Sequence, residues 1–381
     1  MDLTRTAYGT WSGGRFMHFG EPLDDERFIG AIRLAYERGI RTFMTADVYG
    51  SGAADEMLAR ALQGFPRESY CLVGAIGHDF YSGQRDGSKG FPRFTHSQLR
   101  GPRDYADYIR MATEKSLARC GVDRFDCLFL HNPDHAGYTS DAVWNGLDRL
   151  REAGLVDRLG IAPGPANGFS LDLILSFERF GPLLDWAMII LNPLEPWPGS
   201  LCLEAAQKHE VKLITRVVDY GGIFHDDVKP GHEFGSRDHR TFRPAGWVEA
   251  VQDKLREMRP FAEQHGLTML QFASLWNLSQ SPVKSVIPTM IQEVGSGAKP
   301  IEEKITELGN LPEFSFSADE VAEIRRIGDN TGCMTLKGGN PEHIGEPLAD
   351  RWSLTPDLLQ VAERWHIQPH HDLINRHPKV G

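Results

Sequence analysis

A repeated alternation of short apolar segments and amphipathic helices constrains the fold of this chain more than any other feature. Eight segments are short, apolar and rich in β-branched residues, which is typical of parallel strands buried on both faces. They cover residues 7–11, 41–44, 70–76, 125–130, 158–162, 186–191, 211–218 and 283–287, and helical patterns separate them. We therefore predict an α/β fold, a single (β/α)8 barrel with long rim loops, over residues 1–328.

An open, doubly wound sheet is the alternative, but no Gly-x-Gly-x-x-Gly fingerprint follows the first strand. An irregular stretch, residues 78–103, is predicted to be a long functional loop. The last regular helix is expected at residues 318–327. The tail, residues 329–381, has no clear period, and we expect it to be an extension that packs on the barrel.

The composition narrows the possible partners. The net charge of −11 argues against nucleic acid and anionic membranes, and no run of eighteen apolar residues predicts a membrane span. The five cysteines are scattered, and residues 1–5 lack the layout of a signal peptide. We expect a cytoplasmic protein that acts on a small molecule, and the oligomeric state stays open.

The stretch Met44–Gly50 links an expected strand to an expected helix, so Tyr49 lies on a strand-to-helix turn. Such turns carry catalytic groups in parallel barrels, because the carboxyl ends of the strands surround the ligand site. The alternative is an aromatic residue that only packs. The barrel would place the following residues around one rim: Trp11, Met44, Ala75, His131, Ala162, Asn192, Val218 and Thr289.

Over residues 5–328 the chain resembles the aldo-keto reductases. The matching motifs are Gly9-Thr10-Trp11, Ala46-Asp47-Val48-Tyr49-Gly50-Ser51-Gly52, Ser116-Leu117 to Asp126, His131-Asn132-Pro133-Asp134, Leu150-Arg151-Glu152-Ala153-Gly154 and Ser285-Val286-Ile287-Pro288. The resemblance implies carbonyl reduction with NAD(P)H by a tetrad of Asp, Tyr, Lys and His.

Two of the four tetrad positions match. Tyr49 and His131 stand where the family has its acid and its substrate-orienting His, whereas Met44 stands at the Asp position and Ala75 at the Lys position. Asp47 is not the family Asp. A buried Lys without its Asp would be costly, so the joint loss is physically consistent. Without an adjacent cation, we expect the pKa of Tyr49 to stay near 10, which makes it a weaker acid.

The positions that would contact the cofactor differ as well. The family's Ser-Asn pair reads Ala162-Pro163, its strand-six Gln aligns near Met188, and its Gly and basic residue after Ile-Pro are replaced by residues 289–291. The resemblance therefore implies no cofactor or weakly bound NADP(H). If NAD(P) does bind, the candidate contacts are Arg216, Tyr220 and Thr289.

Other polar residues are candidates for the site. For substrate binding we expect Trp11, Asp47, His78, Asn132, Arg216, Asp219 and Tyr220. An Asp219–Arg216 ion pair that only closes the loop is the alternative for these two. A dense group could bind a divalent metal or form a solvated loop: His225, Asp226, Asp227 and His232. Lys89 and Lys337 are possible replacements for the lost Lys.

The sequence leaves three candidate functions. The residues favour non-redox acid–base chemistry (elimination, hydration or isomerisation) on a small polyhydroxylated or carbonyl substrate, with Tyr49 and His131. The first alternative is an NAD(P)H-dependent carbonyl oxidoreductase with a rearranged tetrad, which requires a cation near Tyr49. The second alternative is a catalytically inactive binding subunit.

Overall fold

Eight parallel strands form the centre of the molecule. The computed structural model describes residues 1–87, 90–295, 297–349 and 353–376. The strands are β1 Ala7–Gly9, β2 Thr42–Met44, β3 Cys71–Ile76, β4 Cys127–His131, β5 Leu159–Ala162, β6 Trp186–Ile190, β7 Lys212–Arg216 and β8 Val283–Ile287, paired in that order. A parallel bridge between Thr6 and Val286 joins the first strand region to the last. The predicted (β/α)8 barrel is confirmed.

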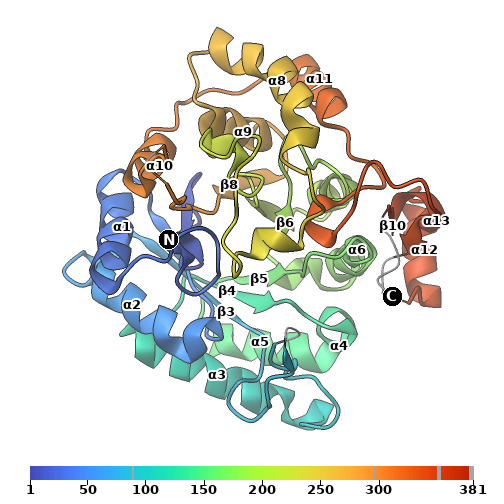
Figure 1. Ribbon diagram of the computed structural model, residues 1–381. Helices are drawn as coiled ribbons and strands as arrows, with labels where there is room; N and C mark the ends of the chain where they lie inside the picture. Colours follow the sequence, from blue (N-terminus) through green and yellow to red (C-terminus); the bar gives the residue numbers. More distant parts are fainter. Residues whose placement is uncertain (88–89, 296, 350–352, 377–381) are drawn as a thin grey trace.

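Helices surround the barrel (Figure 1). They are α1 Asp25–Glu37, α2 Ala53–Leu62, α3 Tyr105–Cys120, α4 His135–Thr139, α5 Asp141–Glu152, α6 Phe169–Phe180, α7 Leu203–Lys208, α8 Gln252–Gln264, α9 Met269–Leu278, α10 Ile301–Gly309 and α11 Ala318–Gly328. Side chains cap several first turns: Asp24 accepts the Arg27 N–H, and Thr268 and Ser317 form capping boxes. These caps fix where α1, α9 and α11 begin.

Apolar side chains form two layers around the strands. Alternate strand residues point into the barrel, and the others pack against the helices. The inner layer consists of Ala7, Met44, Cys71, Val73, Ala75, Cys127, Phe129, Trp186, Met188, Ile214 and Ile287, among others. The barrel interior is therefore a packed core, and ligands are expected at its carboxyl end.

The tail does contain a regular helix, so the prediction that residues 318–327 form the last one was wrong. Helix α12, Pro356–Arg364, begins after the Thr355 cap and buries Leu358 and Val361 on α6. Figure 1 shows it, with α13 Pro369–Asp372, beside α6. A two-stranded antiparallel pair, β9 Leu348–Ala349 and β10 Ile374–Asn375, completes the extension. Capping and i, i+3 apolar spacing are the signals that predict α12.

The first predicted strand is also shorter than expected. It ends at Gly9, and Trp11 precedes a short 3-10 turn, Ser12–Gly14.

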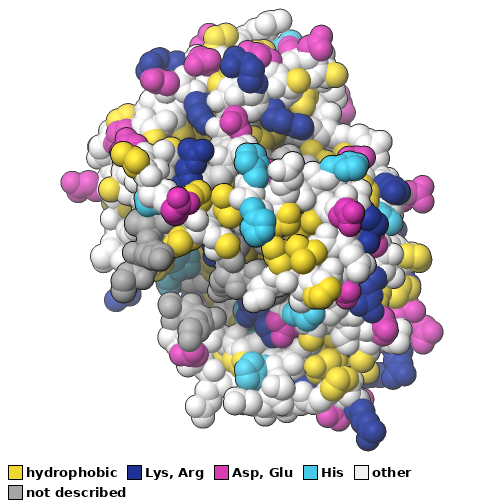
Figure 2. Space-filling view, turned by 90° about the vertical axis from the view of Figure 1, so that its right-hand side faces the viewer, with side chains coloured by type: hydrophobic (Ala, Val, Ile, Leu, Met, Phe, Trp, Pro, Cys, Tyr) yellow, Lys and Arg dark blue, Asp and Glu magenta, His cyan; other side chains and the backbone are white. Residues whose placement is uncertain are grey.

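On the face that carries the extension, basic and acidic side chains are interspersed, without a large patch of one sign (Figure 2). None of the helices among the described residues combines the length and apolar character that a membrane crossing requires.

A buried carboxylate ties β2, α2 and α3 together, which gives a test of the fold. Asp55 accepts hydrogen bonds from Thr45 (2.8 Å), Ser116 (2.8 Å) and Arg119 (3.0 Å). We expect Asp55→Ala to lower the free energy of unfolding by about 3–5 kcal/mol, because the buried Thr45 and Ser116 lose their acceptor and the partly buried Arg119 loses its counterion. The urea midpoint measures this.

The matched control is Asp141→Ala, which removes an exposed pair with Arg179. Its effect should be about 0–1 kcal/mol. Equal shifts of the two midpoints would contradict the structural role assigned to Asp55.

Candidate active site

The carboxyl ends of the strands open into a cavity of about 530 Å³. Seven of the predicted residues line it: Trp11, Tyr49, His78, His131, Asn132, Arg216 and Thr289. They come from loops after five different strands and from the ends of β4 and β7. The barrel therefore brings together side chains that are far apart in the sequence.

Tyr49 and His131 lie next to each other in this cavity. Their ring centroids are 5.7 Å apart, edge to face, and Trp11 packs on the other side of Tyr49 at 6.3 Å. Tyr49 begins a kinked 3-10 turn in which Gly50 and Ser51 have positive φ. The turn projects the phenol from the strand end into the cavity, where the two candidate catalytic groups can reach one ligand atom.

Burial controls the acidity of Tyr49. It raises the pKa of Tyr49 to about 12, and the positive charge of Arg216 only partly opposes this effect. The expected value near 10 was therefore too low, because the sequence gives no measure of desolvation. Met44 and Ala75 line the same cavity and supply no charge.

A second imidazole lies beside His131. The ring centroids of His78 and His131 are 5.3 Å apart, and Asn132 Nδ2 lies 3.3 Å from Nε2 of each. Burial and Arg93 lower the pKa of His78 to about 4. Burial, with the charges of His78, Arg93 and Arg216, lowers the pKa of His131 well below its usual value. Both rings are therefore neutral near pH 7.

The backbone is strained beside these groups. Asn132 and Val217 have φ of 46° and 58°, a region that a β-branched residue rarely adopts. The Asn192 amide donates a hydrogen bond to the Val217 carbonyl and supports that conformation. Strained residues held by their surroundings are common in ligand sites. Here they flank His131 and Arg216.

Three predicted residues do not line the cavity. Asp219 accepts the N–H groups of Thr289 (2.8 Å) and Gly222 (3.0 Å), and it forms no ion pair with Arg216 among the described residues. The Tyr220 hydroxyl lies 2.9 Å from Thr335 Oγ1 in the C-terminal extension. Both side chains stabilise the loop after β7.

Asp47, the third of these residues, is fully buried behind the cavity. Burial and the nearby Asp55 raise the pKa of its carboxyl group well above the usual value, which favours the neutral acid. Its two oxygens have no hydrogen-bond partner within the part of the chain that the structure describes. Val218 is also buried in the core rather than at the cavity wall.

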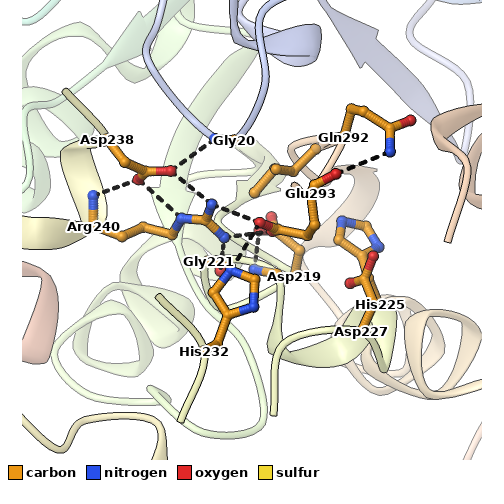
Figure 3. Close-up of polar contacts among 12 residues, drawn as sticks. Gly20, Asp219, Gly221, His225, Asp227, His232, Asp238, Arg240, Gln292 and Glu293 are labelled. Atoms are coloured by element: carbon orange, nitrogen blue, oxygen red, sulfur yellow. Dashed lines mark hydrogen bonds and ion pairs between the residues drawn. The ribbon is translucent and has the colours of Figure 1, made fainter. Parts of the chain in front are cut away.

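The four candidate metal ligands contact separate partners, and three of them, His225, Asp227 and His232, are labelled in Figure 3. The contacts are His225 Nε2 with the Thr289 carbonyl (2.8 Å), Asp226 with Arg259 (2.7 Å), Asp227 with Lys304 (2.6 Å) and His232 with Glu293 (3.3 Å). Among the described residues, no three His, Cys, Asp or Glu side chains converge on one point. The predicted metal cluster is not formed, because two of its carboxylates are taken by cations.

Figure 3 shows instead a buried ion network around Arg240. Arg240 binds both oxygens of Asp238 and both oxygens of Glu293, and Asp238 also accepts the Gly20 N–H at 2.7 Å. A Cβ at Gly20 would lie 2.2 Å from the Gln292 carbonyl oxygen. The network therefore joins the loops after β1, β7 and β8 on one side of the cavity.

Several wall residues were not predicted from the sequence. They include Phe16, Phe19, Phe91, Phe242, Arg243 and Leu336. All lie in loops or short 3-10 turns, where no periodicity shows which side chain points inward. Leu336 comes from the C-terminal extension, next to the contact between Thr335 and Tyr220. Lys89 lies outside the described residues, and Lys337 ends a short 3-10 turn in the extension.

A complete barrel with a tyrosine and a histidine at the carboxyl ends of β2 and β4 defines the architecture and the site. The chain belongs to the aldo/keto reductase family, whose model matches residues 6–329. It is similar to probable aldo-keto reductase 1 of Glycine max, with 29% identity over 84% of this chain and 85% of the relative.

Solved structures share the fold. A glycerol dehydrogenase from Gluconobacter oxydans covers 86% of this chain and 92% of its own, with a TM-score of 0.66 and 24% identity. An aldo-keto reductase from Klebsiella pneumoniae, solved in complex with NADPH, covers 85% of this chain and 91% of its own, with a TM-score of 0.56 and 16% identity. The family assignment predicted from the motifs is confirmed.

A dinucleotide needs phosphate-binding groups next to the catalytic cavity. A second cavity of about 570 Å³ shares Phe16, Gly50 and Arg240 with the first. Its wall carries three arginines and three carboxylates, and two histidines add imidazole donors: Arg15, Arg237 and Arg240, then Glu233, Asp238 and Glu293, then His18 and His232. Such donors suit phosphate oxygens.

The nicotinamide end has fewer polar groups. Ala162 and Met188 line the cavity with apolar atoms, and Tyr220 does not face it, so Arg216 and Thr289 supply the polarity there. The residues of the two cavities fit a dinucleotide. Their contacts with it would differ from those that the family resemblance implies.

The neutral histidines give a test of the site. In imidazole nitrogen NMR, His78 and His131 should stay neutral from about pH 8 to 5.5. His78 should titrate near pH 4, and His135, whose pKa Asp172 raises, should protonate first. A folded pKa below the unfolded value means that the unfolded chain binds more protons. His78 and His131 therefore lower the free energy of unfolding as the pH falls below about 6.5. Protonation of His131 near pH 6.5 would contradict the assigned burial.

Proposed function

We propose that this protein is an NAD(P)H-dependent oxidoreductase that interconverts small carbonyl compounds and alcohols. The observation that carries the proposal is the Tyr49–His131 pair in a cavity with a second cavity beside it that carries arginine and histidine side chains. Family membership and the names of similar proteins, a reductase, a dehydrogenase and an NADPH complex, support it over the non-redox chemistry that the sequence favoured.

When bound, NAD(P)H supplies a hydride to the carbonyl carbon. Tyr49, a neutral phenol at pH 7, donates its proton to the carbonyl oxygen, so its O–H bond breaks as the O–H bond of the alcohol forms. The neutral His131 is a second hydrogen-bonding group for the same oxygen. The phenolate then recovers a proton from water, and the positive charge of Arg216 stabilises it meanwhile.

Side chains for holding the cofactor lie along both cavities. The Thr289 side chain lines the cavity at the nicotinamide end. His18 and Arg237 line the second cavity, where they would bind phosphate oxygens, whereas Arg15 lines it but is paired with Asp25 at 2.5 Å. The Arg240 network would hold the surrounding loops in place rather than bind phosphate, because two carboxylates already neutralise Arg240.

The second candidate is non-redox acid–base chemistry with the same Tyr49 and His131. It is favoured by the apolar Met44, Ala75, Ala162 and Met188 at the positions implied for the tetrad and for the cofactor contacts. Among the described residues, Arg216 also makes no hydrogen bond to the Tyr49 hydroxyl and influences it only through charge. The two candidates differ in whether a dinucleotide binds.

A fluorescence titration with NADPH and NADH separates them. We expect saturable NADPH binding with a dissociation constant between about 1 μM and 1 mM, the range in which Michaelis constants commonly fall. Arg237→Glu should weaken it, because a carboxylate would then face the phosphates. The matched control is Arg256→Glu, an exposed residue of α8. Saturation by neither dinucleotide would contradict the redox proposal and favour the second candidate.

The role of Tyr49 is tested by Tyr49→Phe, which removes the proton donor and keeps the ring. We expect kcat/KM for NADPH oxidation by a panel of small aldehydes to fall about 10²- to 10⁴-fold. Tyr36→Phe, on α1 outside the cavity, is the control and should leave kcat/KM unchanged. An active Tyr49→Phe variant would exclude Tyr49 as the proton donor.

A further inference from the structure

The wall of the catalytic cavity carries positive charge only. Four arginines line it, Arg85, Arg216, Arg240 and Arg243, and no Asp or Glu does so among the described residues. The chain as a whole has 52 acidic and 41 basic residues, so its composition does not explain this wall. The face drawn in Figure 2 mixes both signs. The positive charge is therefore a local property of the cavity.

Three of these arginines already have other contacts. Arg240 is neutralised by Asp238 and Glu293, and Arg85 lies on the exposed part of a loop. Arg243 lies over the rings of Tyr220 (4.9 Å) and Trp247 (4.3 Å), and its charge partly opposes the burial that raises the pKa of Glu195. The charge of Arg216 affects the pKa of Tyr49 and of His131, whereas none of these three arginines contributes to either shift.

Arg216 is different. It donates one hydrogen bond to the Pro163 carbonyl, at 2.8 Å, and it forms no ion pair with a carboxylate in the part of the chain that the structure describes. Burial lowers its pKa, and the groups that oppose this effect are Tyr49 and Tyr138. The Arg216 side chain is only partly exposed, and a partly desolvated guanidinium without a carboxylate partner would be stabilised by a bound anion.

The position of Arg216 fixes where such an anion would lie. The guanidinium lines the cavity together with Tyr49 and His131, and its charge affects the pKa of both. The strained Val217 follows it directly and is fixed through Asn192. A planar guanidinium suits two oxygens of one anionic group.

We propose that the substrate is a small carbonyl compound with an anionic oxygen group, a carboxylate or a phosphate, that Arg216 binds. The inference rests on the proposed function, because it names the substrate class of the same site. The anion would orient the molecule so that its carbonyl oxygen lies between Tyr49 and His131.

Binding of unreactive anions tests the proposal without turnover. We would titrate succinate and inorganic phosphate into the protein by calorimetry, with and without saturating NADP⁺. We expect at least one of them to bind, and Arg216→Gln to weaken that binding by about tenfold or more, since a charged hydrogen bond is lost. Arg216→Lys should give an intermediate affinity, and Arg256→Gln, an exposed residue of α8 outside the cavity, should stay within about twofold of wild type.

Matched carbonyl pairs then identify the anion. Succinic semialdehyde is compared with butanal, and glyceraldehyde 3-phosphate with glyceraldehyde, by kcat/KM. For each pair we divide kcat/KM of the charged substrate by that of the uncharged one. The pair with the higher ratio identifies the anionic group that is bound, and Arg216→Gln should bring that ratio close to one. Thermal unfolding shows whether the variants fold.

Three results would overturn the proposal. In the first, neither anion binds. In the second, wild type and a folded Arg216→Gln variant bind the anion equally. In the third, anion binding is lost when NADP⁺ is added. The last would mean that the dinucleotide occupies the position next to Arg216. Arg216-dependent anion binding in a protein that does not bind NADPH would instead retain the anion site and reject the redox function.

Discussion

Desolvation at the carboxyl end of the barrel determines the chemistry that this site can perform. Burial shifts four titratable groups there toward their neutral forms: it raises the pKa of Tyr49 and lowers the pKa of His78, His131 and Arg216. At neutral pH the cavity therefore offers a neutral phenol and two uncharged imidazoles. Among the described residues, Arg216 is the cation whose charge reaches the phenol.

The same burial explains how the surrounding loops are built. Arg240 is almost inaccessible to water, and its guanidinium is stable there because two carboxylates and the Gly221 carbonyl take up its donors. This network joins three loops whose chain positions are far apart, so it limits their movement beside the cavity. The extension contributes in a similar way, since the buried Glu195 accepts the N–H of Thr335 at 2.8 Å and thereby fixes the turn that carries Leu336.

The barrel and the meeting of Tyr49 with His131 were predictable because they depend on local patterns. Strand length, helical period and the turn after β2 determine that Tyr49 and His131 reach one cavity, whatever the loops do. The direction of side chains after β7 was not predictable. Asp219 and Tyr220 follow Val217, whose positive φ has no signal in a β-branched residue, and this backbone turns both side chains away from the cavity. Desolvation was equally hidden, which is why the pKa of Tyr49 was expected near 10.

The cost of burying a cation explains both the absence of a Lys at the Ala75 position and the proposed role of Arg216. A cation at the Ala75 position, on β3, would lie in the packed inner layer and would need a carboxylate at the Met44 position to offset its burial. Arg216 lies instead at the end of β7, where its guanidinium lines the cavity and can be neutralised by a ligand. A cation of this kind is fully stabilised only when the substrate is bound. Its influence on Tyr49 would then depend on which anion is present, because a bound carboxylate or phosphate partly cancels the field that lowers the pKa of the phenol. In such a site, substrate charge and proton donation are coupled through one side chain.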